Sequence, residues 1–202
     1  MRVIAGRFRG RSLTAPHGHT TRPITDRAKE SLFNVLGGRF GEPGSLPDLD
    51  VLDLFAGSGA LGIEALSRGA RSGLFVEKDR AALSALRQNV AALKLSQEAR
   101  IIAENAWTLP IRPPTAQGFG LVFVDPPYRE VTQTERVDAL LMTLSRNVAE
   151  DGLIVLRHGI ETSYSPCGLQ TLQCVDERRF GSMRILLLAR PNRPQNPPAA
   201  VE

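Results

Sequence analysis

The chain has 202 residues, of which 42% are hydrophobic and 23% charged, and its formal net charge is +4. This length and composition predict a globular protein of one main domain with a sizeable core. No apolar run approaches the roughly 20 residues that span a bilayer, and the first residues lack the continuous apolar stretch of a signal peptide. We therefore expect a cytoplasmic protein that does not enter a membrane.

The positive charge is concentrated at the amino terminus. Residues 1–25 contain five arginines and no acidic residue, so this segment carries +5 and the other 177 residues carry −1. Such an asymmetry favours a polyanionic partner such as nucleic acid. The alternative is a solvated basic arm without a partner. Residues 2–13 predict a short strand or hairpin, and a helix is expected to begin near Thr25 or Asp26, which are common N-cap residue types.

From Val51 onward, short apolar runs alternate with helical patterns. Strands are predicted at 51–55, 73–79, 99–105, 120–127 and 153–158, helices at 60–70, 80–95 and 134–152, and an antiparallel hairpin at 169–190. This alternation predicts an α/β fold with a mainly parallel sheet covered on both faces, whose ligands bind beyond the carboxyl ends of the strands. We divide the chain into an extension that includes the basic arm and is expected to bind nucleic acid (1–40), a core domain (41–190) and a disordered tail (191–202).

A glycine-rich loop follows the first of these core strands. Gly57, Gly59 and Gly62 form a G-x-G-x-x-G pattern, and Glu77 follows Gly57 by 20 residues. The pattern alone indicates a dinucleotide site, so an NAD-dependent oxidoreductase is one hypothesis; a plain tight turn is another. Asp53 would repel a diphosphate, whereas it could face a cationic amine or order the loop. Asp53 and Glu77 together favour S-adenosylmethionine over NAD.

The segment VFVDPPY, residues 122–128, ends the fourth strand. Pro126 and Pro127 lack N–H groups and stiffen the backbone, so we expect its carbonyls to stay out of a helix. These carbonyls and the Asp125 carboxylate are acceptors, which favours a ligand with an amino group. Tyr128 could stack on an unpaired or flipped base; the alternative is a rigid loop with a packed tyrosine. We call Asp125–Tyr128 the DPPY corner. For this corner to bind an amino group it must be open, and the Asp125 carboxylate must not be occupied by a neighbouring arginine.

Asn105 and the few Cys and His residues are weaker signals, for which ordinary structural roles are also considered. Asn105 follows the third strand, where its side-chain oxygen could accept from an adenine amino group or serve as an ordinary turn residue. Cys167 and Cys174 are expected to be reduced, and His17 and His19 form an isolated pair in a loop. The sequence therefore predicts no metal site.

Together, VLDLFAGSGALGIEALSRGA, FVEKD and FVDPPY resemble the amino-methylating, S-adenosylmethionine-dependent methyltransferases. With RVIAGRFRGRSL and TRPITDRAKESLFNVL the resemblance narrows to the RsmD family of bacterial 16S rRNA guanine-N2 methyltransferases. It implies a Rossmann-like class I methyltransferase fold: a mostly parallel seven-stranded sheet with an antiparallel last strand, plus an N-terminal β-hairpin and helix. Adenine-N6 methylation of DNA or RNA stays open, as does a non-catalytic RNA-binding protein.

The resemblance also implies roles for individual residues. The implied cofactor-binding residues are Asp53, Ala56, Gly57, Gly59, Glu77, Asn105 and Ala106, and the implied catalytic residues are Asp125, Pro126 and Tyr128. Many relatives carry Asp where this chain has Asn105, but an amide can still accept a hydrogen bond. The implied partner is 16S rRNA, within the small ribosomal subunit or an assembly intermediate, and we expect a monomer.

The basic arm is the predicted RNA contact. If residues 7–11 are extended, alternate arginines project to one face and Phe8 turns toward the core. Guanidinium groups suit phosphates because they bind them in a bidentate manner. The predicted RNA-binding residues are Arg7, Arg9, Arg11, Arg22, Arg27 and Lys29.

Overall fold

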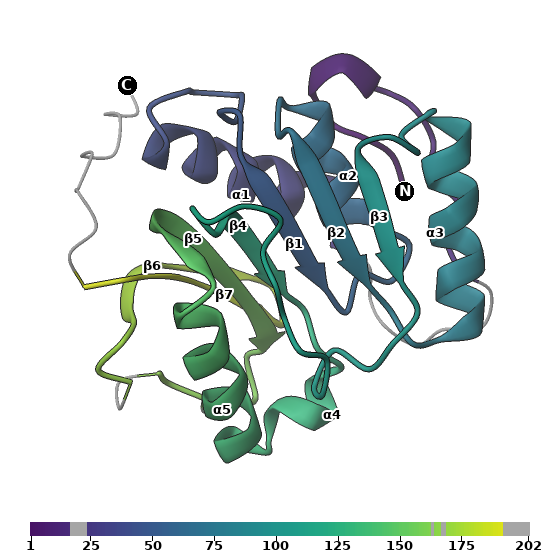
Figure 1. The fold of residues 1–202 in the computed structure, drawn as a ribbon. Helices are drawn as coiled ribbons and strands as arrows, with labels where there is room; N and C mark the ends of the chain where they lie inside the picture. Colours follow the sequence, from purple (N-terminus) through teal and green to yellow (C-terminus); the bar gives the residue numbers. More distant parts are fainter. Residues whose placement is uncertain (17–23, 163, 167–168, 192–202) are drawn as a thin grey trace.

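The structure is a computed structural model that describes residues 1–16, 24–162, 164–166 and 169–191 (Figure 1). For Tyr128 and Arg129 it describes the backbone alone. Predictions for His17, His19, Arg22 and Cys167 lie outside the described residues, as does the tail predicted to be disordered, apart from Pro191.

A seven-stranded sheet forms the centre of the molecule, in the order β3-β2-β1-β4-β5-β7-β6. The strands are β1 (Asp50–Leu54), β2 (Ser72–Val76), β3 (Ala99–Ile102), β4 (Phe119–Val124), β5 (Val148–Gly159), β6 (Gln173–Phe180) and β7 (Met183–Ala189). Strands β1 to β5 pair in parallel, and β7 runs antiparallel to both of its neighbours, β5 and β6. The predicted α/β fold class with an antiparallel last strand is confirmed.

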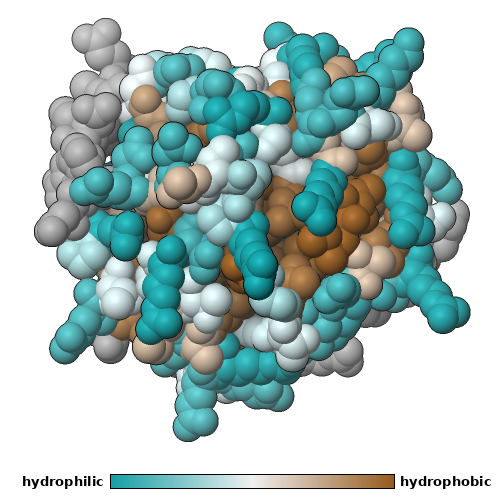
Figure 2. Space-filling view, viewed as in Figure 1, coloured by the Kyte–Doolittle hydropathy of each residue, from teal (hydrophilic) through white to brown (hydrophobic). Residues whose placement is uncertain are grey.

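Helices cover the two faces of the sheet unequally. They are α1 (Asp26–Arg39), α2 (Ala60–Ser67), α3 (Arg80–Ala92), α4 (Tyr128–Val131) and α5 (Thr134–Ser145). Helices α1 to α3 contribute to one hydrophobic core, and α4 and α5 to the other (Figure 1). Figure 2 shows hydrophobic side chains at the surface over β2 and β3, where none of the described helices lies in front of the sheet. The predicted coverage of both faces is therefore incomplete over β2 and β3.

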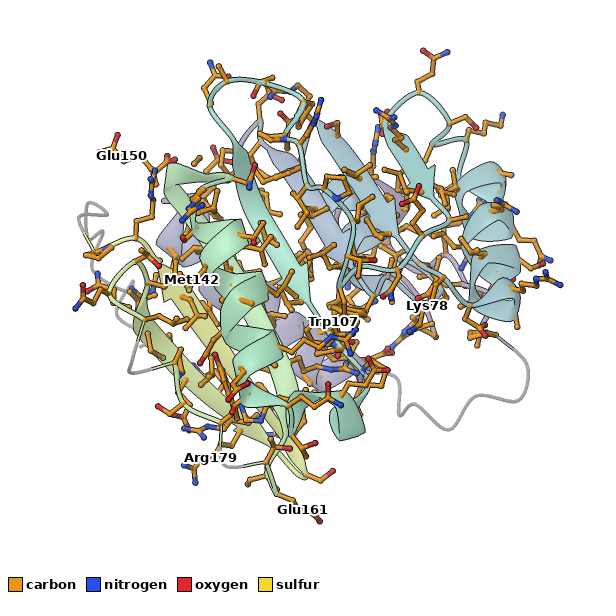
Figure 3. All side chains as sticks on the ribbon, turned by 60° about the horizontal axis from the view of Figure 1, so that its bottom comes forward. Lys78, Trp107, Met142, Glu150, Glu161 and Arg179 are labelled. Carbon is orange, nitrogen blue, oxygen red and sulfur yellow. The ribbon has the colours of Figure 1, made fainter. Side chains whose placement is uncertain are left out.

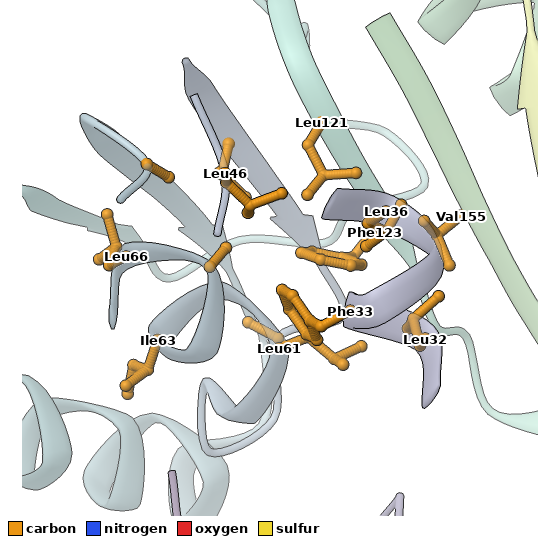
Figure 4. Close-up of a cluster of buried hydrophobic side chains, with 14 of the residues drawn as sticks. Leu32, Phe33, Leu36, Leu46, Leu61, Ile63, Leu66, Leu121, Phe123 and Val155 are labelled. Carbon is orange, nitrogen blue, oxygen red and sulfur yellow. The ribbon is translucent and has the colours of Figure 1, made fainter. Parts of the chain in front are cut away.

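The N-terminal helix belongs to the main core. The Thr25 side chain caps α1 by accepting from Ala28 N at 3.2 Å, as its residue type predicts. Phe33 of α1 packs against Phe123 of β4, with ring centroids 5.8 Å apart (Figure 4). The segment treated as an extension thus supports the strand that carries the DPPY corner.

Residues 1–13 form a compact loop closed by one antiparallel bridge, where a short strand or hairpin was predicted over 2–13. Arg2 and Ser12 make one antiparallel bridge, and Gly6–Phe8 form a 3₁₀ turn between them. The extended conformation expected for 7–11 is therefore not adopted; Gly6, with a φ of +76°, allows the chain to turn there. Phe8 packs against the core, as predicted.

Two further boundaries differ from the predictions. The helix expected over 134–152 ends at Ser145, because Val148 instead pairs with Phe119 across the sheet and begins β5. The short helix α4 begins directly after Pro127, a residue type that is favoured at helix starts. Helical periodicity and strand pairing compete at such positions, and tertiary contacts decide between them.

Candidate active site

The carboxyl ends of β1, β2 and β4 bring the predicted residues to one edge of the sheet. Asp53 of β1 pairs in register with Phe75 of β2 and Phe123 of β4. Glu77 follows β2 directly, and Asp125 follows β4 directly. Figure 3 brings this edge toward the reader and shows Lys78 and Trp107 on it.

The glycine loop combines a close contact with an open side. Gly59 has a φ of +84°, which strains other residue types, and a Cβ there would lie 2.5 Å from the Leu86 side chain of α3 and would have to displace it. A Cβ on Gly57, whose φ is +57°, would meet nothing within 4 Å. The backbone at Gly57 is therefore accessible to a ligand.

The Glu77 carboxylate joins the glycine loop to the next strand. Its Oε2 accepts from Gly57 N at 2.8 Å, and its Oε1 accepts from Lys78 N and Asp79 N, also at 2.8 Å. Three backbone N–H groups hold the Glu77 side chain in one orientation beside the glycine loop. The loop geometry depends on Glu77 before any ligand binds.

Asp53 orders the start of α2. Its Oδ2 accepts from Gly62 N at 2.9 Å, and the side chain is buried. Burial raises the pKa of Asp53 well above its ordinary value, and the nearby Asp125 and Glu77 add to this, while Arg157 opposes it. Of the two roles considered for Asp53, the structure shows loop ordering; its acidic surroundings also favour a cation nearby.

Asp125 forms an ion pair that the sequence analysis did not predict. Arg157 Nε lies 2.7 Å from Asp125 Oδ1, and the two side chains are 8% and 20% exposed. Burial raises the pKa of Asp125, and the Arg157 charge counteracts this. The expectation of a carboxylate without an arginine neighbour is therefore wrong. The Asp125 side chain nevertheless remains partly exposed, whereas the adjacent Pro126 is buried, and Oδ2 accepts no hydrogen bond from the described residues.

The two proline carbonyls differ. Pro127 O accepts from Glu130 N at 2.8 Å as α4 begins, which corrects the expectation that both carbonyls stay out of a helix. Within the described chain, the carbonyl of Pro126 has no hydrogen-bond donor. Asp125 Oδ2 and Pro126 O are thus the two acceptors left without a donor from the described residues, although Pro126 itself is buried. The Tyr128 side chain is not described, so its stacking role stays a prediction.

The segment after β3 has a local structural role. Asn105 Oδ1 accepts from Trp107 N at 3.2 Å, the turn role that was weighed for it. Ala106 is buried in the core, and Ala56 N donates to Val76 O at 3.0 Å. These residues lie at strand ends on the same edge, and their contacts to adenine or to the methionine part remain predictions.

An aromatic cluster at this edge was missed. Trp107 donates from Nε1 to Glu130 Oε2 at 2.6 Å, its ring centroid lies 5.0 Å from that of Phe55, and the Arg136 guanidinium lies 4.5 Å from its ring centre. Phe55 has a φ of +62°, an uncommon conformation for a non-glycine residue. The cluster links the glycine loop, the segment after β3 and α4. Its sequence signal was a single tryptophan two residues after Asn105.

Comparison with known proteins places the chain among methyltransferases. A family model described as "Conserved hypothetical protein 95" matches residues 1–189. A Bacillus subtilis relative, "Putative rRNA methyltransferase YlbH", is 42% identical over 80% of this chain and 84% of its own. The Escherichia coli "Ribosomal RNA small subunit methyltransferase D" is 38% identical over 80% of this chain and 76% of its own. A solved E. coli structure, "Putative methyltransferase yhhF", superposes with a TM-score of 0.76 at 34% identity and covers 96% of this chain and 99% of its own.

The chain belongs to the RsmD family. A Thermus thermophilus structure described as "hypothetical protein TTHA0928" also superposes, with a TM-score of 0.71 at 28% identity over 94% of this chain and 99% of its own. The family model matches the chain from residue 1, so its match includes the amino-terminal segment.

In this RsmD-family chain, the predicted RNA-binding residues have different environments. Arg9, Arg11 and Arg27 are exposed. Arg7 forms an ion pair with Glu98. Lys29 is a correction: its side chain is fully buried, with Nζ 2.6 Å from Arg2 O and 3.2 Å from Glu64 Oε2, so it cannot contact RNA. Its helix turns it inward, which composition does not reveal.

Glu64 of α2 anchors the N-terminal arm to the core. Its oxygens accept from Ile4 N at 2.8 Å and Ala5 N at 3.0 Å, and Arg68 Nε lies 2.9 Å away. Burial lowers the pKa of Lys29, and Glu64 opposes this shift. The arm is therefore held by a buried network of charges.

Within the ranges that the structure describes, no three His, Cys, Asp or Glu side chains are grouped so as to hold a metal ion. None of the described helices has the length and apolar character to cross a membrane.

Proposed function

We propose that the chain transfers a methyl group from S-adenosylmethionine to the N2 amino group of guanine 966 in 16S rRNA. The observation that carries this proposal is the pair of acceptors, Asp125 Oδ2 and Pro126 O, on the same sheet edge as the glycine loop fixed by Glu77. The names of the relatives support small-subunit rRNA as the substrate. We propose that the chain acts as a cytoplasmic monomer on the small subunit or an assembly intermediate.

The charges at the site fit a cationic cofactor. Asp53, Glu77 and Asp125 lie close enough for the two others to raise the pKa of Asp53. A diphosphate would be repelled there, whereas a positive charge would relieve the repulsion between carboxylates. S-adenosylmethionine supplies a methyl group on a positively charged sulfur. Glu77 would hold the ribose, Asn105 and Ala106 the adenine, and the backbone at Gly57 and Gly59 the methionine part.

The acceptors at the DPPY corner would make the amino group of the base more reactive. An exocyclic amino group is a weak nucleophile because its lone pair is delocalised into the ring. Asp125 Oδ2 and Pro126 O would accept hydrogen bonds from its two N–H groups and draw the nitrogen toward a tetrahedral geometry, which frees the lone pair. The nitrogen would then form a bond to the methyl carbon as the methyl–sulfur bond breaks, and it would lose one proton. The base must be unpaired or flipped out to reach this corner, and Tyr128 would stack on it.

The identity of the methylated nucleoside distinguishes the proposed reaction from its alternatives. Purified chain is incubated with methyl-labelled S-adenosylmethionine and either naked 16S rRNA or small subunits that lack the modification, and the nucleosides are analysed by mass spectrometry. We expect N2-methylguanosine at one position. Labelled N6-methyladenosine would support the adenine methyltransferase instead. No transfer, with a melting temperature raised by NAD and not by S-adenosylmethionine, would support the oxidoreductase.

A further inference from the structure

Arg157 is a buried cation beside the carboxylate on which the proposed reaction depends. Its side chain is 8% exposed, and its Nε lies 2.7 Å from Asp125 Oδ1. We propose that Arg157 is a positioning residue for methyl transfer: it holds Asp125 through one oxygen and directs the other toward the amino group of the substrate base. This inference rests on the proposed function and extends it to a residue on a different strand.

The sheet register makes this contact a fixed feature of the fold. Val124 of β4 pairs with Leu156 of β5, so the next residues, Asp125 and Arg157, lie side by side. Arg157 is also paired with Ile185 of β7, which holds its backbone from the other side. Phe123 and Val155, two residues earlier on each strand, pack in the core that α1 covers (Figure 4). Alternation along a strand places Asp125 and Arg157 on that same face.

The charges around Asp125 explain why a cation is needed there. Asp53 approaches from β1, Glu77 from the end of β2 and Arg157 from β5. Two carboxylates and one guanidinium thus act on the charge of Asp53, and the guanidinium contacts Asp125 directly. Removing the positive charge would favour a protonated Asp125, and a protonated carboxyl loses acceptor capacity. Arg157 therefore favours the ionised form of Asp125 against the effect of burial and orients its carboxylate, which are the two properties that the proposed reaction requires.

A structural salt bridge and a positioning residue predict different pH profiles. The test compares Arg157→Gln, which removes the charge, with Arg157→Lys, which keeps it. A matched control is Arg68→Gln, because Arg68 is another buried arginine paired with a carboxylate, Glu64, but lies away from the edge with Asp125. Single-turnover rates on the RNA substrate are measured from pH 5.5 to 9, with calorimetric affinity for S-adenosylmethionine and the melting temperature of each variant.

We expect Arg157→Gln to slow transfer about 10–100-fold at pH 7, the range for partners that orient a reacting group. Affinity for the cationic cofactor should be equal or higher, because a positive charge has been removed. The acidic limb of the rate profile should move to higher pH, so the loss should shrink under alkaline conditions. Arg157→Lys should recover most of the rate, and Arg68→Gln should lower the melting temperature without moving the limb.

A second comparison uses a group that cannot titrate. In an Asp125→Asn background, Arg157→Gln should have little further effect on the rate, because the carboxylate it serves is absent. Wild-type rates and an unshifted profile in Arg157→Gln would overturn this inference alone. Absence of methyl transfer by the unaltered chain on any RNA substrate would overturn the proposed function, and this inference with it.

Discussion

At the scale of single residues, the three carboxylates of the sheet edge have distinct environments. Glu77 accepts from three backbone N–H groups, Asp53 accepts from Gly62 N in a buried setting, and Asp125 pairs with Arg157. Backbone donors and a cation favour ionised carboxylates, and burial disfavours them. Asp53 is therefore the acid that costs the most to keep charged, and Asp125 is the one that the protein stabilises with a buried counter-ion.

We predict that Asp53→Asn makes the free protein more stable at neutral and alkaline pH. The folded-state pKa of Asp53 is raised above its unfolded value, so its ionisation opposes folding as pH rises through the folded pKa. An asparagine keeps an acceptor for Gly62 N without this charge. Each kcal/mol gained should raise the melting temperature by about 2–4 °C.

The gain from Asp53→Asn should vanish at acidic pH, where Asp53 is protonated in both the folded and the unfolded state. Affinity for S-adenosylmethionine should fall, because the site loses a negative charge. Thermal melts across pH and calorimetry on the same protein measure the two effects. A variant that is less stable than the parent at pH 8 would show that the Asp53 charge is not a cost to folding.

At the scale of elements, the side chains of Glu64 and Ser67 hold the N-terminal arm to α2. Glu64 accepts from the backbone of Ile4 and Ala5 and pairs with Lys29 and Arg68, all away from solvent. We predict that Glu64→Ala lowers the free energy of unfolding by about 3–5 kcal/mol, the usual cost of leaving a buried charge unpaired. Urea titration measures this loss.

Asp48→Asn is the control for Glu64→Ala, because the Asp48–Arg71 pair is solvent-exposed. Solvent screens exposed pairs, so this change should be close to neutral for stability. Equal losses in the two variants would contradict an anchoring role for Glu64.

Hydrophobic periodicity predicted the elements that have a continuous apolar pattern. It failed for short elements, whose conformation depends on local geometry. The strands around Asp53 and Asp125 were predicted because each is an unbroken apolar run next to a turn signal. The 3₁₀ turn at Gly6–Phe8 and the short helix α4 were not predicted, because three or four residues contain too little pattern to show a period.

At the scale of the whole molecule, the asymmetric charge points to the surface that would meet RNA. Arg9 and Arg11 are exposed, whereas the Arg7 charge is partly offset by Glu98. We predict that replacing Arg9 and Arg11 together with alanine lowers the slope of log affinity against log salt by about two units. Filter binding of the rRNA at several salt concentrations measures the slope. Arg7→Ala should change it less, and an unchanged slope in the double variant would remove these residues from the RNA contact.

Sequence predicted those site residues that follow directly from a local pattern, such as the end of a predicted strand. Asp53, Glu77 and Asp125 each lie at the end of a predicted strand, so their convergence follows from the parallel fold. The Arg157 contact depends on the register between β4 and β5, and the burial of Lys29 depends on how α1 packs against α2. Neither the register nor the packing is encoded in a local pattern, so both required the structure.

The central claim is that Asp125 acts on the base and not on the cofactor. The most direct measurement is the single-turnover rate of Asp125→Ala on the rRNA substrate, together with its calorimetric affinity for S-adenosylmethionine. We predict a rate lower by about 10²–10³-fold, the range for losing one organised electrostatic contact, with cofactor affinity retained. Full activity in Asp125→Ala would contradict the claim.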